Sequence, residues 1–151
     1  MALKPGKDMI VKMGTNTIVG IGDVSMDGVT VEELETSAFG NNGWKTFQSG
    51  MKDGGTISFS GQYDLDDTNG QIALAQALVN GTEITTLRIY MDSTSYYEPC
   101  QTTGWLTSAD STGNSTVLSN VKVTAHNIKG AVNAMATVDF RLKVSGCMVQ
   151  V

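Results

Sequence analysis

The chain has 151 residues, of which 40% are hydrophobic and 17% charged, and its formal net charge at pH 7 is −5. This length and apolar content suit one folded domain with a hydrophobic core, so we expect a single domain over residues 1–151. The acidic balance argues against a general nucleic-acid binder, because such proteins need Lys and Arg to displace counterions from phosphate. The apolar runs are short, which predicts neither a signal peptide nor a membrane span.

Glycine separates short runs in which apolar and polar residues alternate. Seventeen glycines against two prolines in such a pattern are typical of a β protein with many turns. In the N-terminal half the predicted strands are residues 9–13, 17–22, 28–36 and 56–63. In the last of these, one face carries Ile57, Phe59 and Tyr63, and the opposite face carries Ser58, Ser60 and Gln62.

The segment 37–55 has no clear period and is predicted to be a long inter-strand loop. Loops of this length inside a domain are usually functional or disordered. Its apolar side chains, Phe39, Trp44, Phe47 and Met51, are too many for a disordered linker. Each of them must be buried somewhere, either on the core of its own chain or on a partner.

One helix is predicted, over residues 69–80. Thr68 and Gln71 have the spacing of a capping box at its start, and Asn80-Gly81 is a left-handed stop at its end. Strands follow at 84–92, 103–109, 117–125 and 134–144, and the last two form a hairpin around Gly130. The whole pattern predicts a mainly β fold, a sandwich or barrel with one flanking α-helix.

The sequence offers little catalytic chemistry. His126 is the single histidine, and without a second one no Ser or Cys nucleophile has an evident base, so we expect no catalytic residues and no enzyme. The acidic turn 64–70 begins like a calcium loop, but its glycine comes one position late and Ala75 replaces the closing Glu. We therefore predict no metal and no cofactor, and assign the acids to the helix N-terminus. Cys100 and Cys147 are expected to remain thiols.

A specific resemblance lies between Trp44 and Tyr63. The run Gly43-Trp44-Lys45-Thr46-Phe47 is followed by Gly50-Met51-Lys52-Asp53-Gly54-Gly55-Thr56-Ile57-Ser58-Phe59. This order resembles the siphophage tail tube (major tail) proteins, in which such a glycine-rich turn leads into a strand and then, past an acidic turn, into the helix. The layout of nearly the whole chain fits the same family.

The resemblance implies a structural virion protein. Its subunits form hexameric rings that stack into the phage tail tube, and DNA crosses the lumen without specific binding. The implied partners are further copies of the chain, a tape-measure protein, and tail-tip and tail-terminator proteins. The implied location is the virion after assembly in the host cytoplasm, and the C-terminal immunoglobulin-like decoration of many members is not expected. The long loop then supplies the inter-ring contacts, with candidates Phe39, Trp44, Phe47, Met51, Lys52 and Asp53.

The lining of the channel is the second implied site. A wall of negative potential lets a duplex slide, because it does not capture phosphates. The candidates for the lumen are Glu32, Glu33, Ser58, Ser60, Gln62 and Asp139. The cations Lys122, Arg141 and Lys143 on the C-terminal hairpin oppose this charge, so they either pair with acids of the neighbouring subunit or face elsewhere.

Two other classes of protein compete with this interpretation. One is the inner-tube subunit of a contractile injection or secretion system, which has the same ring architecture. The other is a monomeric β-sandwich module for adhesion, whose aromatic platforms would be Trp44, Trp105 and the pair Tyr96-Tyr97.

Overall fold

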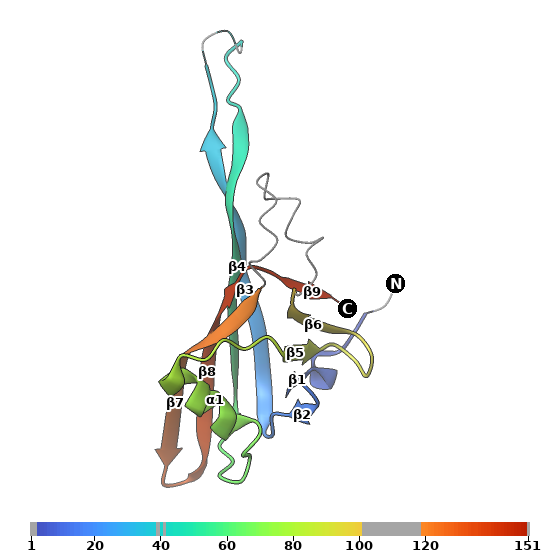
Figure 1. Ribbon diagram of the computed structural model, residues 1–151, viewed down its shortest axis with the longest axis vertical. Helices are drawn as coiled ribbons and strands as arrows, with labels where there is room; N and C mark the ends of the chain where they lie inside the picture. The colour runs from blue at the N-terminus through green and yellow to red at the C-terminus, as the bar shows by residue number, and fades with distance from the viewer. Residues whose placement is uncertain (1–2, 39, 41, 101–118, 151) are drawn as a thin grey trace.

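The computed structural model describes residues 3–38, 40, 42–100 and 119–150. Its strands form two antiparallel sheets (Figure 1). The short sheet has the order β2-β1-β5-β6-β9 and the long sheet the order β3-β4-β8-β7. The short sheet consists of β1 (Ile10–Met13), β2 (Asn16–Thr17), β5 (Leu87–Tyr90), β6 (Tyr96–Pro99) and β9 (Met148–Gln150). The long sheet consists of β3 (Ile21–Glu35), β4 (Phe47–Gln62), β7 (Asn120–Ala131) and β8 (Ala134–Ser145). Helix α1 spans Gln71–Asn80, and a 3₁₀ turn spans Gly6–Asp8.

The core lies between the two sheets and under α1. Strands β4, β7 and β8 alternate as predicted and bury Ile57, Phe59, Val121, Val123, Val138, Phe140, Leu142 and Val144. The short sheet contributes Val11, Leu87 and Ile89, and the helix contributes Leu74 and Ala77. The Phe59 and Phe140 rings lie 5.4 Å apart at the centre of the long sheet. Each fully buried side chain of this size contributes about 1.5–3 kcal/mol, so the predicted alternation accounts for the fold class, which is confirmed.

Helix α1 begins in a way that the sequence did not reveal. The predicted capping box is wrong, because Gly70 is the N-cap and makes no side-chain cap hydrogen bond. The Asp67 carboxylate takes that role, accepting hydrogen bonds from the backbone amides of Gln71 and Val19, each at 3.0 Å. At the other end the predicted stop is confirmed, since Gly81 adopts φ 66° and its N–H bonds back to the last turn.

Several strand predictions differ from the structure. The separate strands predicted at 17–22 and 28–36 are wrong, because β2 ends at Thr17 and β3 runs without a break from Ile21 to Glu35. The predicted hairpin turns after Ala131, and Gly130 lies within β7. The predicted strand 84–92 is shorter in the structure, where β5 spans only Leu87–Tyr90. Ile84 instead forms an isolated bridge with Val121, near the start of β7. Strands β6 and β9 were missed, since each has only a few residues and no clear alternation. The predicted strand 103–109 lies outside the described residues.

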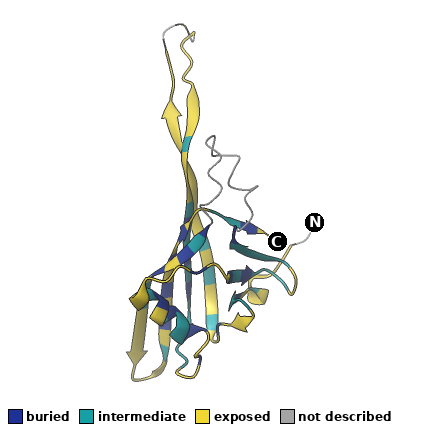
Figure 2. Cartoon of the chain, viewed as in Figure 1, coloured by how far each residue is buried: buried dark blue, intermediate teal, exposed yellow. Residues whose placement is uncertain are grey.

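The largest difference concerns the predicted loop 37–55. Strand β4 already begins at Phe47 and pairs with β3 as far as Glu35, so the irregular segment is only 36–46. Residues 29–35 of β3 and 47–54 of β4, with the described residues between them, form a two-stranded extension, here called the arm, which projects from the body along the longest axis (Figure 1). The arm is exposed over almost its whole length (Figure 2).

The arm leaves the body at two glycines. Gly28 and Gly55 stand in adjacent strands with φ of 75° and 87°, a region that favours glycine. A Cβ on Gly55 would lie 2.3 Å from the carbonyl oxygen of Asp27, so no side chain fits there. The exposed face of β4 carries Ser58 and Ser60 below this point. Above it, Asp53 reaches the same face, where it pairs with Lys143. The alternation of β4 therefore changes its face at the two glycines.

Candidate functional site

One face of the long sheet is covered by polar side chains. The predicted lumen residues Ser58, Ser60 and Gln62 lie on β4 and stand opposite Arg141, Asp139 and Thr137 of β8. On the other side of β4, Asp23 stands opposite Ser60, and Ser25 stands opposite Ser58. The structure thus brings Ser58, Ser60, Gln62 and Asp139 together on one surface, as the sequence predicted. Glu32 and Glu33 are not part of it, because they lie on the arm, where Glu33 pairs with Ser49.

The cations of this face find acids within the same chain. Lys143 forms an ion pair with Asp53 at the root of the arm, and the Lys122 ammonium lies 3.7 Å from the Glu83 carboxylate. Lys143, together with the Gly55 N–H, holds the pKa of Asp53 below its usual value. The partners seen for Lys143 and Lys122 belong to the same chain, and pairing with acids of a neighbouring subunit stays a prediction. Among the described residues, Arg141 forms no ion pair.

The two edges of the long sheet carry opposite charge. Edge strand β3 exposes Asp23 and Asp27, and edge strand β7 exposes Lys122 and Lys129. Apart from the bridge at Val121, β7 has no strand on its outer side among the described residues. Such edges are templates for pairing with another chain. Strands β3 and β7 run in opposite directions, so β7 of one copy beside β3 of the next would continue the antiparallel order.

The arm presents apolar side chains to solvent. Trp44 is 77% exposed, Phe47 55% and Met51 82%. These three do not pack on the core of their own chain, although a fold-back of each was an open alternative from the sequence. Lys52 stands opposite Val31 on the arm. Phe39 lies outside the described residues.

Catalytic and metal chemistry is sparse in the part of the chain that the structure describes. There, no group of three or more His, Cys, Asp or Glu side chains could hold a metal ion. No helix in the described ranges is long and apolar enough to cross a bilayer.

Cys100 follows the last residue of β6, and Cys147 precedes the first residue of β9. The two residues are neighbours, since the Cys100 amide donates to the Cys147 carbonyl at 3.0 Å. Burial raises the pKa of the Cys147 thiol.

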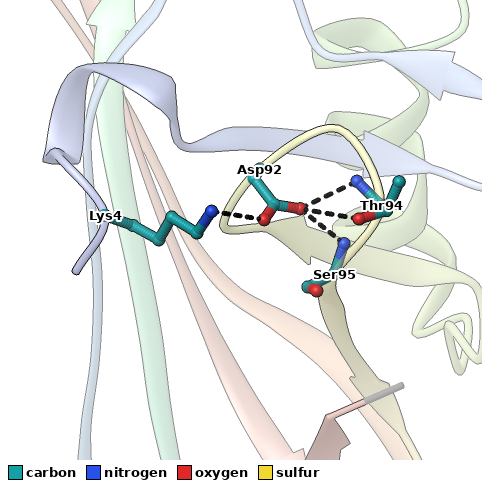
Figure 3. A network of polar contacts seen from close by, with 4 residues as sticks. All are labelled: Lys4, Asp92, Thr94 and Ser95. Carbon is teal, nitrogen blue, oxygen red and sulfur yellow. Dashed lines mark hydrogen bonds and ion pairs between the residues drawn. The ribbon is translucent and has the colours of Figure 1, made fainter. Parts of the chain in front are cut away.

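A polar network fastens the N-terminal segment to the loop between β5 and β6. The Asp92 carboxylate accepts hydrogen bonds from the Ser95 and Thr94 amides, at 2.7 and 2.8 Å, and pairs with Lys4 at 3.0 Å (Figure 3). The Ser95 amide contributes most to holding the pKa of Asp92 well below its usual value. This contact is a short-range anchor for the chain end, and it carries no chemistry.

Gln71 is a structural residue that the sequence analysis placed only in a capping box. It is almost fully buried, and its amide nitrogen donates to the carbonyls of Val19 at 2.8 Å and Gln62 at 2.9 Å. Its amide oxygen accepts from the Asp64 N–H at 3.0 Å. Gln71 thereby joins the first turn of α1 to the start of β3 and the end of β4.

The aromatic platforms expected of an adhesion module are only partly present. Tyr96 and Tyr97 lie in β6 and are half-buried, with the Tyr96 ring packed 4.8 Å from Tyr90. Trp105 lies outside the described residues. Trp44 alone among the described candidates is well exposed, and it stands on the arm rather than beside a binding cleft.

Comparison with known proteins gives a consistent answer for the fold. No family model and no curated protein sequence matches the chain. A chain in the virion of a native gene transfer agent particle has a TM-score of 0.71 at 15% identity, covering 99% of both chains. A chain in the tail of an empty GTA particle, solved with C6 symmetry, has a TM-score of 0.70 at 15% identity, covering 97% of this chain and 98% of that one.

Contractile systems supply similar structures as well. A chain in the sheath/tube terminator of an extracellular contractile injection system, PVC, has a TM-score of 0.66 at 12% identity, covering 100% of this chain and 98% of that one. The two-sheet body with one helix and a long hairpin is thus shared almost end to end with components of tails and injection systems. The protein has the tail tube fold.

Proposed function

We propose that the protein is the structural subunit of a phage tail tube, built from rings of identical copies, and that it has no catalytic role. The observation that carries this proposal is the long sheet, with two open edges of opposite charge and one mostly polar face. Head-to-tail pairing of unlike edges generates a ring when the rotation between copies closes. Antiparallel addition of β3 to β7 then makes one continuous barrel. Six copies per ring are supported by the C6 symmetry of the similar GTA tail.

The polar face of the long sheet then lines the lumen. Ser58, Ser60, Gln62 and Asp139 present hydroxyl, amide and carboxylate groups, none of which is a strong ligand for phosphate. Two of the cations on this face are neutralised by Asp53 and Glu83 of the same subunit. With −5 per chain, a ring of six carries 6 × −5 = −30. Such a wall repels a duplex toward the axis and lets DNA pass without specific binding.

Stacking of the rings is assigned to the arm. A projecting hairpin with exposed Trp44, Phe47 and Met51 has the composition of an interface core, in which buried aromatics carry much of the binding energy. The further partners are those of a tail: a tape-measure protein, a tail-tip complex and a terminator. The proposed location is the virion, after assembly in the host cytoplasm. The tail is a siphophage tail without a sheath.

The alternative is the inner tube of a contractile injection system, which the similarity to the PVC terminator favours. The two differ in whether the outer wall of the tube binds a sheath. Tubes that remain bare in the presence of their complete set of tail proteins support the siphophage assignment. Tubes that acquire a helical sheath support the contractile one.

Electron microscopy of the purified protein at high concentration, with the tail-tip initiator added, tests the proposal. Rings or hollow tubes are expected, and a strictly monomeric protein under all such conditions would contradict the proposal.

The lumen assignment has its own test, in which Asp139→Lys tubes are compared with Thr94→Lys tubes for DNA ejection. Asp139→Lys should make ejection slow and salt-sensitive, whereas Thr94 lies on an exposed loop beyond the short sheet and its variant should behave as wild type. Equal ejection through both tubes would remove Asp139 from the wall.

A further inference from the structure

A groove lies between α1 and edge strand β7, at the end of the body opposite to the arm (Figure 1). Its volume is about 350 Å³, and its walls are mostly apolar. The lining includes Tyr63, Ile72, Ala75, Val79 and His126. Val79 on the rim is 84% exposed, which is unusual for a large aliphatic side chain on the helix of a small body.

One polar atom in this groove lacks a partner. The His126 ring stacks on Phe140, with centroids 4.6 Å apart and planes inclined by 10°, so its orientation is fixed by the core. Its Nε2 is buried and makes no hydrogen bond to any described residue. A buried unsatisfied nitrogen costs about 1–3 kcal/mol. In the tautomer that carries its proton on Nδ1, the imidazole offers Nε2 as an acceptor. The groove therefore suits a large apolar side chain that carries one hydrogen-bond donor.

The chain carries such a side chain on its own arm. The indole of Trp44 is a large apolar group whose N–H is a donor only, and it is 77% exposed. The arm projects from one end of the molecule and α1 lies on the body toward the other end, so Trp44 does not reach the groove of its own chain (Figure 1). It reaches an equivalent groove only on another copy. A projection at one end and a matching recess at the other is the arrangement that generates an open, head-to-tail polymer.

We infer that the α1–β7 groove is the receptor for the arm of a second copy in the adjacent ring, with the Trp44 indole seated in it and its N–H donated to His126 Nε2. The inference rests on the proposed tube function and names the surface through which rings stack. It accounts for two features at once: the exposed indole and the unsatisfied imidazole nitrogen. It also assigns a role to Val79, whose side chain becomes part of the wall around the indole.

Photo-cross-linking maps the contact directly. Benzoylphenylalanine at position 44 keeps an aromatic side chain there. After digestion with trypsin, position 44 lies in the peptide 13–45, and helix α1 lies in the peptide 53–88. Irradiated tubes are expected to yield this peptide pair, with the cross-link in residues 71–80, and irradiated dilute subunits are expected not to. A cross-link to the peptide 123–129, which holds His126, supports the inference as well. Tubes whose position 44 cross-links to neither of these two peptides overturn the inference while the tube function stands. If the wild-type chain forms no tubes at all, both fail.

Substitution of the donor separates the hydrogen bond from the packing. Trp44→Phe removes the N–H and keeps most of the apolar surface, and Trp44→Ala removes both. The critical concentration for tube formation is expected to rise several-fold for the first variant and more than tenfold for the second. In a His126→Phe background, which has no acceptor, Trp44→Phe should cost little or nothing more. An equal additional rise in that background shows that Trp44 and His126 do not act on each other, and it overturns the assignment of the bond.

Discussion

Gln71 gives the sharpest test of how the body is held together. Gln71→Leu keeps the size of the side chain but removes its hydrogen bonds to Val19, Gln62 and Asp64. At about 1 kcal/mol of net stability for each bond, the free energy of unfolding should fall by about 3 kcal/mol. For a chain of this size each kcal/mol lowers Tm by about 2–4 °C, so Tm should fall by about 6–12 °C.

The assay is thermal unfolding of dilute subunits followed by circular dichroism. Gln76→Leu is the matched control, because Gln76 lies on the same helix and is exposed. Its effect should stay within about 0.5 kcal/mol. Gln71→Glu should be at least as damaging as Gln71→Leu, because it turns a carboxylate oxygen toward the carbonyls of Val19 and Gln62. Equal Tm values for the Gln71→Leu and Gln76→Leu variants would refute the view that Gln71 joins the helix to the long sheet.

Three further predictions concern other parts of the molecule. Gly55→Ala should lower the free energy of unfolding by about 2–4 kcal/mol, because Gly55 has a left-handed backbone and the new Cβ would meet the Asp27 carbonyl. Gly130 has open space around it, so Gly130→Ala should change the free energy of unfolding by less than about 1 kcal/mol. Urea titration of the two variants measures both values. The lowered pKa of Asp92 means that its contribution is fully present above the ordinary value of 3.8 and is lost only as pH falls through the lower folded value. The protection of the Ser95 amide against hydrogen exchange, relative to an unfolded peptide at the same pH, should therefore be the same at pH 3 as at pH 5. If this protection is already lost at pH 3, the carboxylate is not held as described. Because the pKa of Cys147 is raised, its thiol should react slowly with iodoacetamide at pH 8 in the folded chain and rapidly in urea. Equal rates in the two conditions would show that Cys147 is an exposed thiolate in the folded chain.

The sequence predicted those elements whose pattern is set by one buried face. Phe140 and Leu142 alternate with Arg141 and Lys143, and the strand follows directly from that period. The helix was found from its apolar run and from Gly81 at its end. Its start was not, because the residue that accepts the first hydrogen bonds is Asp67, which lies four residues before Gln71, the first residue of the helix.

The arm was missed for a physical reason. A strand exposed on both faces has no apolar alternation, so the segment from Phe47 to Gly54 looks irregular. The pairing of Gly28 with Gly55 is also invisible from sequence, since it depends on the register between β3 and β4. Trp44, Phe47 and Met51 were named as contact candidates because apolar side chains in an irregular glycine-rich segment need a partner, and the structure shows these three exposed. The groove between α1 and β7 could not be predicted, since His126 and Val79 come together only in three dimensions.

The arm also shows why the subunit depends on its neighbours. A two-stranded hairpin is marginal in water. Besides the β3–β4 ladder, the arm has the exposed Asp53–Lys143 pair at its root and hydrogen bonds between Thr36 and Thr46 near its tip. Such exposed contacts contribute little, so most of the stability of the arm must come from covering Trp44, Phe47 and Met51 with another chain. Hydrogen exchange should therefore be fast at the arm amides 48–53 in dilute subunits and slow in tubes. The amides of 57–60, on the same strand but inside the body, should be protected in both states. Arm amides that are already protected in the isolated subunit would show that the hairpin is stable alone, and assembly would then have no ordering to supply.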